Sequence, residues 1–253
     1  MLRRIRALST AKSPRRCGRS KLGTQFVRKL LAESLEPRHL MAAYINEVHF
    51  NPLFGDATKH QYVELRGDSL SSMSAGTYLV VIGSSDGVFE LGDIHTIFNL
   101  SNQQFGSNGM LVLLESASNF TVDPAARVLK GTDGFAGMPG NTFSADAGTS
   151  SKQIRTGSNT FLLIQSNVAP SLNNDIDGND DGTPDGAYLN WTILDGFTEF
   201  PWVENVWPQK AYAPIVFQED GVGSGMPGAT LVRTEDLAYV GRIGQSTGYS
   251  PND

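Results

Sequence analysis

The residues best suited to chemistry are the oxygen-bearing side chains of one nine-residue stretch, 177–185, which reads D-G-N-D-D-G-T-P-D. Calcium is a hard cation that binds about six to eight oxygen atoms, and oxygen-bearing side chains at alternate loop positions can wrap one side of it. Glycine at the sixth position, here Gly182, permits the sharp turn that such wrapping needs. We therefore predict Ca²⁺ ligands at these five positions: Asp177, Asn179, Asp181, the main-chain carbonyl of Thr183, and Asp185.

The loop departs from an EF-hand at its twelfth position, where Tyr188 stands in place of the bidentate glutamate. Its flanks also lack the pattern of paired helices, so the stretch resembles the calcium loops of thrombospondin repeats and dockerins. The missing ligand predicts weak binding, with a dissociation constant of about 10⁻⁴–10⁻³ M, as in extracellular modules. Asp175 and Asp180 add negative potential and are alternative ligands. The competing interpretation is a solvated acidic turn without metal.

The charge of −6 is unevenly distributed along the 253 residues. Residues 1–43 carry eleven of the twenty Lys and Arg and only two acids, a net charge of +9, whereas residues 44–253 carry −15. We therefore expect residues 1–43 and residues 44–253 to be two segments with different functions. The acidic body argues against nucleic-acid binding, because phosphate backbones require Lys and Arg. The one cysteine, Cys17, lies in the basic piece, and no apolar run approaches the length of a membrane span.

Residues 1–43 are predicted to be a largely disordered basic sorting or leader segment. The stretch from Leu35 to Ala43 reads L-E-P-R-H-L-M-A-A and resembles the LEPR motif of large predicted surface proteins of planctomycete bacteria. It departs from that motif at Met41, where a second leucine is usual. The resemblance implies an exported protein, secreted or held at the cell surface. A basic tail that contacts anionic lipid or nucleic acid is the alternative.

From Tyr44 onward, short runs rich in Val, Ile, Leu, Tyr and Phe alternate with Gly, Asn, Asp, Ser and Pro, a pattern typical of strands and turns. No sustained helical period follows residue 43. The sequence therefore predicts an all-β sandwich over residues 44–253, with a long insertion at about 116–159. The expected strands are 44–50, 61–66, 77–83, 94–99, 109–115, 160–165, 191–195, 212–217 and 229–233.

Three segments resemble a bacterial lamin-tail domain, which is immunoglobulin-like. They are the run from Ile45 to Pro52, the run from Gln61 to Leu65 and the strand from Gly76 to Val81. Such a run of hydrophobic, polar, Glu and hydrophobic residues ending in Asn-Pro begins that family's first strand. The resemblance implies an immunoglobulin-like β-sandwich acting as a non-enzymatic adhesive or accessory module.

Other motifs are weaker. The aromatic residues Trp191, Trp202, Trp207, Phe197 and Phe200 suggest either a sugar-binding platform or, more simply, a packed core edge. The polar residues His49, His60, Glu47 and Glu64 lack the spacing of a known metal motif, so we predict no catalytic residues. Gly221–Gly225 is expected to be a flexible turn.

We expect a non-enzymatic surface protein with an extracellular protein or glycan partner. The alternatives are an accessory carbohydrate- or protein-binding module and a metal-dependent hydrolase or nuclease.

Overall fold

The structure is a computed structural model, and strands and turns make up almost all of its described part. It describes residues 43–50, 60–84, 91–138, 143–145, 152–154, 157–172, 174–200, 208–219, 230–232 and 237–243. All of these belong to the unit His39–Asp253, the second of two units in the chain. Residues 35–42 of the LEPR-like stretch, Trp202, Trp207 and Gly221–Gly225 lie outside the described residues. No helix among the described residues is long and apolar enough to cross a membrane.

Twelve strands and one short 3-10 helix form the described part of the chain. In chain order they are β1 (Tyr44–His49), β2 (Tyr62–Arg66), β3 (Thr77–Gly83), β4 (Ile94–Asn99), β5 (Met110–Leu114), β6 (Arg127–Lys130), β7 (Phe143–Ala145), β8 (Asn159–Gln165), η1 (Gly186–Asn190), β9 (Thr192–Phe200), β10 (Val216–Glu219), β11 (Thr230–Val232) and β12 (Tyr239–Gly241).

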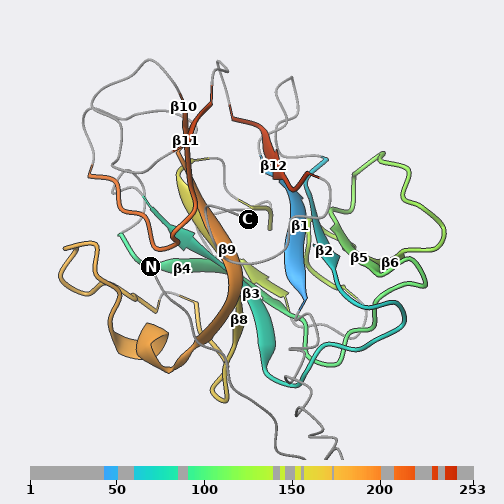
Figure 1. Ribbon diagram of the computed structural model, residues 1–253, viewed down its shortest axis with the longest axis horizontal. Helices are drawn as coiled ribbons and strands as arrows, with labels where there is room; N and C mark the ends of the chain where they lie inside the picture. Colours follow the sequence, from blue (N-terminus) through green and yellow to red (C-terminus); the bar gives the residue numbers. More distant parts are fainter. Residues whose placement is uncertain are drawn as a thin grey trace, which may run out of the picture. The chain divides into compact units, whose positions relative to one another are not determined.

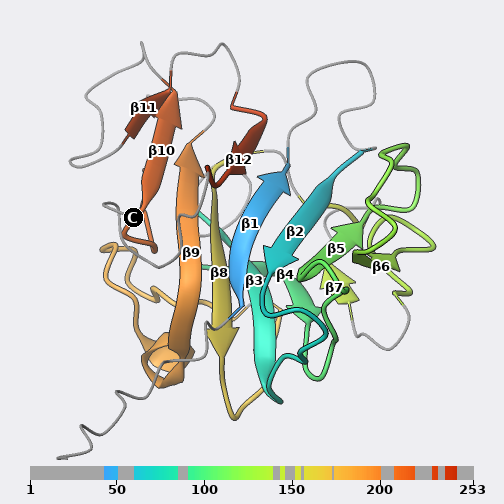
Figure 2. The same ribbon diagram turned by 45° about the vertical axis from the view of Figure 1, so that its right-hand side comes forward.

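These strands form two sheets (Figures 1 and 2). One has the order β12-β1-β2-β5-β6 and the other has the order β11-β10-β9-β8-β3-β4-β7. Both sheets are mixed, since β5–β6, β9–β10 and β10–β11 are parallel pairs and the other described pairs are antiparallel. The all-β prediction is confirmed, and the arrangement is sandwich-like. The lamin-tail type stays a prediction.

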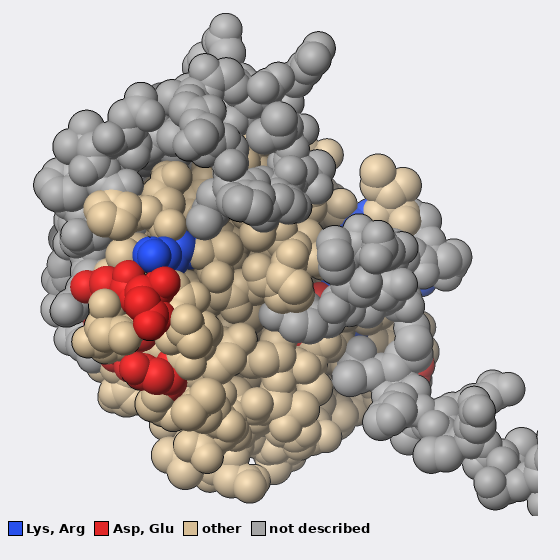
Figure 3. All heavy atoms as spheres, turned by 60° about the vertical axis from the view of Figure 1, so that its left-hand side comes forward, with Lys and Arg blue, Asp and Glu red and all other residues tan. Residues whose placement is uncertain are grey.

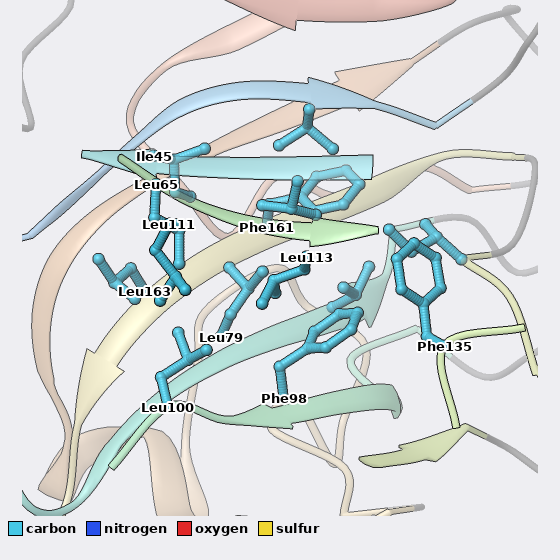
Figure 4. Close-up of a cluster of buried hydrophobic side chains, with 14 of the residues drawn as sticks. Ile45, Leu65, Leu79, Phe98, Leu100, Leu111, Leu113, Phe135, Phe161 and Leu163 are labelled. Atoms are coloured by element: carbon cyan, nitrogen blue, oxygen red, sulfur yellow. The ribbon is translucent and has the colours of Figure 1, made fainter. Parts of the chain in front are cut away.

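The main core lies between the two sheets. Alternate apolar residues of β2 and β5, such as Leu65 and Leu111, and of β3 and β8, such as Leu79 and Phe161, belong to one buried cluster. Figure 4 shows these side chains pointing toward one another from both sheets. Phe161 stacks on Phe197, with ring centroids 4.9 Å apart. Burial of these large apolar side chains makes the main contribution to the free energy that holds the two sheets together.

The opposite face of the seven-stranded sheet carries a second buried cluster. Val80 and Ile164 of the sheet pack there against Ile176, which immediately precedes the acidic loop, and against Tyr212 and Ala213 from the segment before β10. This face of the sheet is therefore covered by connecting segments. Because Ile176 is fully buried, the acidic loop that follows it is anchored to the sheet by hydrophobic packing.

The nine expected strands coincide with observed strands, although the segment expected at 212–217 begins its strand only at Val216 and the one expected at 191–195 continues to Phe200. Three short strands were not predicted. β6 and β7 lie within 116–159, so that segment contributes to both sheets and is not simply an elaborated loop. The third, β12, pairs with the edge of β1. None of these three strands is itself an apolar run of strand length: β6 begins and ends with a charge, β7 reads F-S-A and β12 reads Y-V-G.

Candidate metal centre

The acidic loop is attached to the seven-stranded sheet by main-chain hydrogen bonds on its N-terminal side. Ile176 N donates to Gly92 O at 3.0 Å, and Ile94 N donates to Asn174 O at 3.0 Å, so the loop begins as an extension of the sheet next to β4. Asp93 and Asp175 form the β-bridge between the two segments. A ligand bound by the loop would therefore be coupled directly to the fold.

Asp177, the first predicted ligand, is completely buried. Its Oδ1 accepts a hydrogen bond from Asp181 N at 3.1 Å, and its Oδ2 accepts from Gly182 N at 2.8 Å and from the Tyr212 hydroxyl at 2.9 Å. Burial and the hydrogen bond to Asp177 raise the pKa of Tyr212, which therefore stays a donor. A carboxylate oxygen has about two lone pairs, so Oδ2 is saturated and Oδ1 retains one lone pair for a cation.

The other predicted ligands lie on the exposed side of the loop. Asp181 accepts from Thr183 N at 2.7 Å and from Asn179 Nδ2 at 3.0 Å, and these bonds, with Thr183 contributing most, lower its pKa. Asp185 is exposed. A Cβ placed on Gly178 would lie 4.0 Å from Asp185 Oδ2 and 3.4 Å from Asp175 Oδ2, so both carboxylates lie near Gly178. Figure 3 shows acidic side chains gathered on this face with a basic group beside them.

The donor set consists of oxygen atoms alone, which fits calcium chemistry. Among the residues that the structure describes, however, no three His, Cys, Asp or Glu side chains are grouped closely enough to hold a metal ion. Like-charged carboxylates repel one another when no cation neutralises them. Binding an ion therefore requires Asp181 and Asp185 to turn toward the free lone pair of Asp177.

The turn at Gly182 forms as the sequence predicts, with φ at +88°. A second reason for glycine at position 182 was not visible in the sequence. A side chain at this position would meet Lys210 Cδ at 2.8 Å, because the lysine stem runs beneath the loop and its Nζ donates to Asp181 O at 3.0 Å. Lys210 and Tyr212 are the parts of this centre that sequence reasoning missed, and neither carries a local signal that links it to a loop about thirty residues earlier.

Gly92, two residues before β4, lies close to the start of the loop. Its φ is +84°, and a Cβ there would lie 2.6 Å from Asp175 Oδ1 and 2.9 Å from Asp177 N. We expect Gly92→Ala to destabilise the fold by more than the roughly 1–2 kcal/mol that positive φ alone costs, measured by urea denaturation. Gly186→Ala is the matched control, since its φ is also positive, at +54°, but the atom nearest to a Cβ there lies at 3.8 Å. Equal losses in the two variants would contradict this role for Gly92.

Of the other residues singled out in the sequence, the described members of the aromatic group and the two histidines His49 and His60 pack against neighbouring side chains. Phe197 and Phe200 are buried, and Trp191 packs half-buried beside Tyr188, with ring centroids 5.7 Å apart. These described members of the aromatic group are thus buried or half-buried, as a packed core edge requires. His49 stacks on Tyr62 at 5.5 Å, and His49 Nδ1 lies 3.1 Å from His60 O.

Comparisons with known proteins indicate neither a family nor a function. No family model, no curated protein and no solved structure matches this chain.

Proposed function

We propose that this chain is an exported, non-enzymatic β-sandwich of lamin-tail type, acting in adhesion or cell-surface architecture, in which the loop 177–185 binds calcium as a structural ligand. The export and family parts of the proposal rest on the LEPR-like stretch and on the strand motifs that resemble lamin-tail domains. An acidic body and a weak calcium loop suit an extracellular setting, where calcium is abundant. An extracellular protein or glycan is the proposed partner.

One observation carries the structural role of the calcium. The carboxylate of Asp177 is fully buried and joins two segments: the loop itself, through Asp181 N and Gly182 N, and the segment before β10, through Tyr212. The neighbouring Ile176 packs against the sheet. A cation on the free lone pair of Asp177 Oδ1 would neutralise a buried negative charge and draw Asp181 and Asp185 inward. The ion would thus stabilise the covered face of the seven-stranded sheet.

The expected result is a calcium-dependent melting temperature. For dissociation constants of about 10⁻⁴–10⁻³ M, 10 mM calcium adds about 1.4–2.7 kcal/mol to the free energy of unfolding, because only the folded state binds. For a domain of this size the melting temperature rises by about 3–10 °C relative to excess chelator. Differential scanning calorimetry of the full chain measures this shift.

Asp181→Ala abolishes the calcium response with little cost to the fold, because this side chain is exposed. Asp68→Asn, at an exposed acid outside the loop, is the control for general charge effects and keeps the full response. A melting temperature that is the same in chelator and in 10 mM calcium refutes the structural role. A response that Asp181→Ala leaves intact places the ion elsewhere.

A further inference from the structure

A cavity lies on the outer face of the five-stranded sheet, away from the main core. Its volume is about 300 Å³, the lower end of the range for small-molecule sites. The floor is formed by the outward-facing residues of β5, Met110, Val112 and Leu114, and one wall is formed by Phe120 from the connection between β5 and β6. This connection, drawn in green in Figure 2, runs beside the two strands. It covers Val112 and Leu114, which are 3% and 4% exposed although they face away from the core.

Two carboxylates face this cavity from neighbouring strands. Glu47 of β1 and Glu64 of β2 are directly paired in the antiparallel register, and both line the cavity, as does Asp123 of the connection. Like charges directly opposite each other destabilise a sheet. None of the lining residues, all of which the structure describes, is a lysine or an arginine. The cavity thus holds an excess of negative charge over an apolar floor.

Neutral groups satisfy these carboxylates only in part. The Tyr62 hydroxyl donates to Glu47 Oε1, and Asn46 Nδ2 donates to Glu64 Oε1 at 2.6 Å. Partial burial, and after it the negative charge of Glu47, raise the pKa of Glu64, although the Asn46 hydrogen bond and the charge of Arg66 act in the opposite direction. Arg66 follows on the same face of β2 but does not line the cavity. A cation placed inside would stabilise both ionised carboxylates.

The shape and lining of the cavity select the kind of cation. The carboxylates lie over an apolar floor and beside an aromatic ring, surroundings that suit a ligand with both a cationic end and an apolar part. An alkylammonium ion carries a compact positive charge with three N–H donors at the end of an aliphatic stem. The stem suits Met110, Val112 and Leu114. The half-exposed ring of Phe120, which also contacts Tyr62 edge-on at 5.0 Å, suits a cation–π contact.

We propose that this cavity binds an alkylammonium group, with the cation between Glu47 and Glu64 and the aliphatic stem on the outer face of β5 against Phe120. The group is presented either by a free amine or by a lysine side chain of a peptide. This site shares no residue with the acidic loop, so its test is independent of the calcium role.

The test is isothermal titration calorimetry of the full chain at low ionic strength with n-pentylammonium as the probe. 1-Pentanol and pentanoate, of the same length, are the neutral and anionic comparisons. We expect n-pentylammonium to bind at least about tenfold more tightly than 1-pentanol, because it forms charge-assisted hydrogen bonds with the two glutamates, and pentanoate to bind most weakly. Acetyl-Gly-Lys-Gly-amide distinguishes the two sources. Binding as tight as that of the free amine assigns a lysine side chain, and much weaker binding assigns a free amine.

Two variants locate the binding. Glu64→Gln keeps the shape and the acceptor for Asn46 but removes the charge, so it should weaken n-pentylammonium binding by about tenfold and leave 1-pentanol unaffected. Asp68→Asn removes the same charge from an exposed position outside the cavity and should leave both affinities unchanged. Circular dichroism establishes that both variants are folded. The proposal is overturned if n-pentylammonium binds no more tightly than 1-pentanol, or if the two variants lose affinity equally.

Discussion

Replacing Asp195 by alanine is expected to lower the free energy of unfolding by about 3–5 kcal/mol, the range for removing one member of a buried ion pair. Asp195 lies on β9 of the seven-stranded sheet and is 1% exposed. Its Oδ2 accepts from Ile45 N of β1 at 2.7 Å, and its Oδ1 accepts from Arg242 Nη2 at 2.6 Å. Arg242 Nε in turn donates to Ile45 O at 2.8 Å. This one carboxylate therefore connects the two sheets, and its loss removes the acceptor of the buried Ile45 amide and the charge that faces the Arg242 guanidinium.

An exposed ion pair provides the matched control. Lys152 and Asp133 are joined at 2.7 Å, nearly the same separation, but their side chains are 49% and 65% exposed, compared with 14% and 1% for Arg242 and Asp195. Asp133→Ala should cost less than about 1 kcal/mol, because water screens the pair. Urea denaturation of both variants measures the difference. Similar losses would show that Asp195 does not connect the sheets in the way the hydrogen bonds indicate.

Replacing Glu199 by glutamine is expected to remove a pH dependence of stability. Glu199 lies on β9, fully buried, and its Oε1 accepts from Asn159 Nδ2 at 2.8 Å, while Oε2 has no hydrogen-bond partner among the described residues. Burial raises its pKa well above the usual 4.5. A folded-state pKa above the unfolded value stabilises the fold fully below about pH 4.5. This stabilisation is lost as the pH rises through the folded-state pKa.

The size of the effect follows from proton linkage. Between the two pKa values, wild-type stability falls by about 1.4 kcal/mol per pH unit through this group. Glu199→Gln has no such loss, so its free energy of unfolding relative to wild type should rise with pH from about pH 4.5 upward. Asp195, whose pKa burial also raises despite Arg242, contributes equally to both proteins and cancels. Urea denaturation from pH 4 to pH 9 tests this, with Asp68→Asn as the exposed control. A constant difference across this range contradicts it.

The strands that hold the main core were predictable because their residue types carry the signal. β3 matches its predicted range at both ends, since Leu79 and Val81 face one buried cluster while Val80 and Ile82 face the other. A continuous apolar run is the pattern of a strand that is buried on both faces. β6 gave no such signal. Its four residues begin and end with a charge, and only Leu129 of the strand is buried.

The candidate metal centre was partly predictable for a related reason. The alternation of Asp and Asn about Gly182 is a local pattern, and the turn with positive φ forms where it predicts. The burial of Asp177 is not local. It depends on the Tyr212 hydroxyl and on Gly92, which lie far from it in the chain and are brought together only when the sheet forms.

The sequence by itself determined an acidic, all-β body and an oxygen-rich loop, because composition and short-range spacing are sufficient for both. Only the tertiary structure decided which side of each strand these residues occupy. In β1 the register shifts between Ile45 and Glu47, so Asn46 forms a bulge. Ile45 then enters the core, while Glu47, two residues later, faces the outer cavity opposite Glu64. A strictly alternating strand would place both residues on one face, and the extra residue of a bulge reverses this.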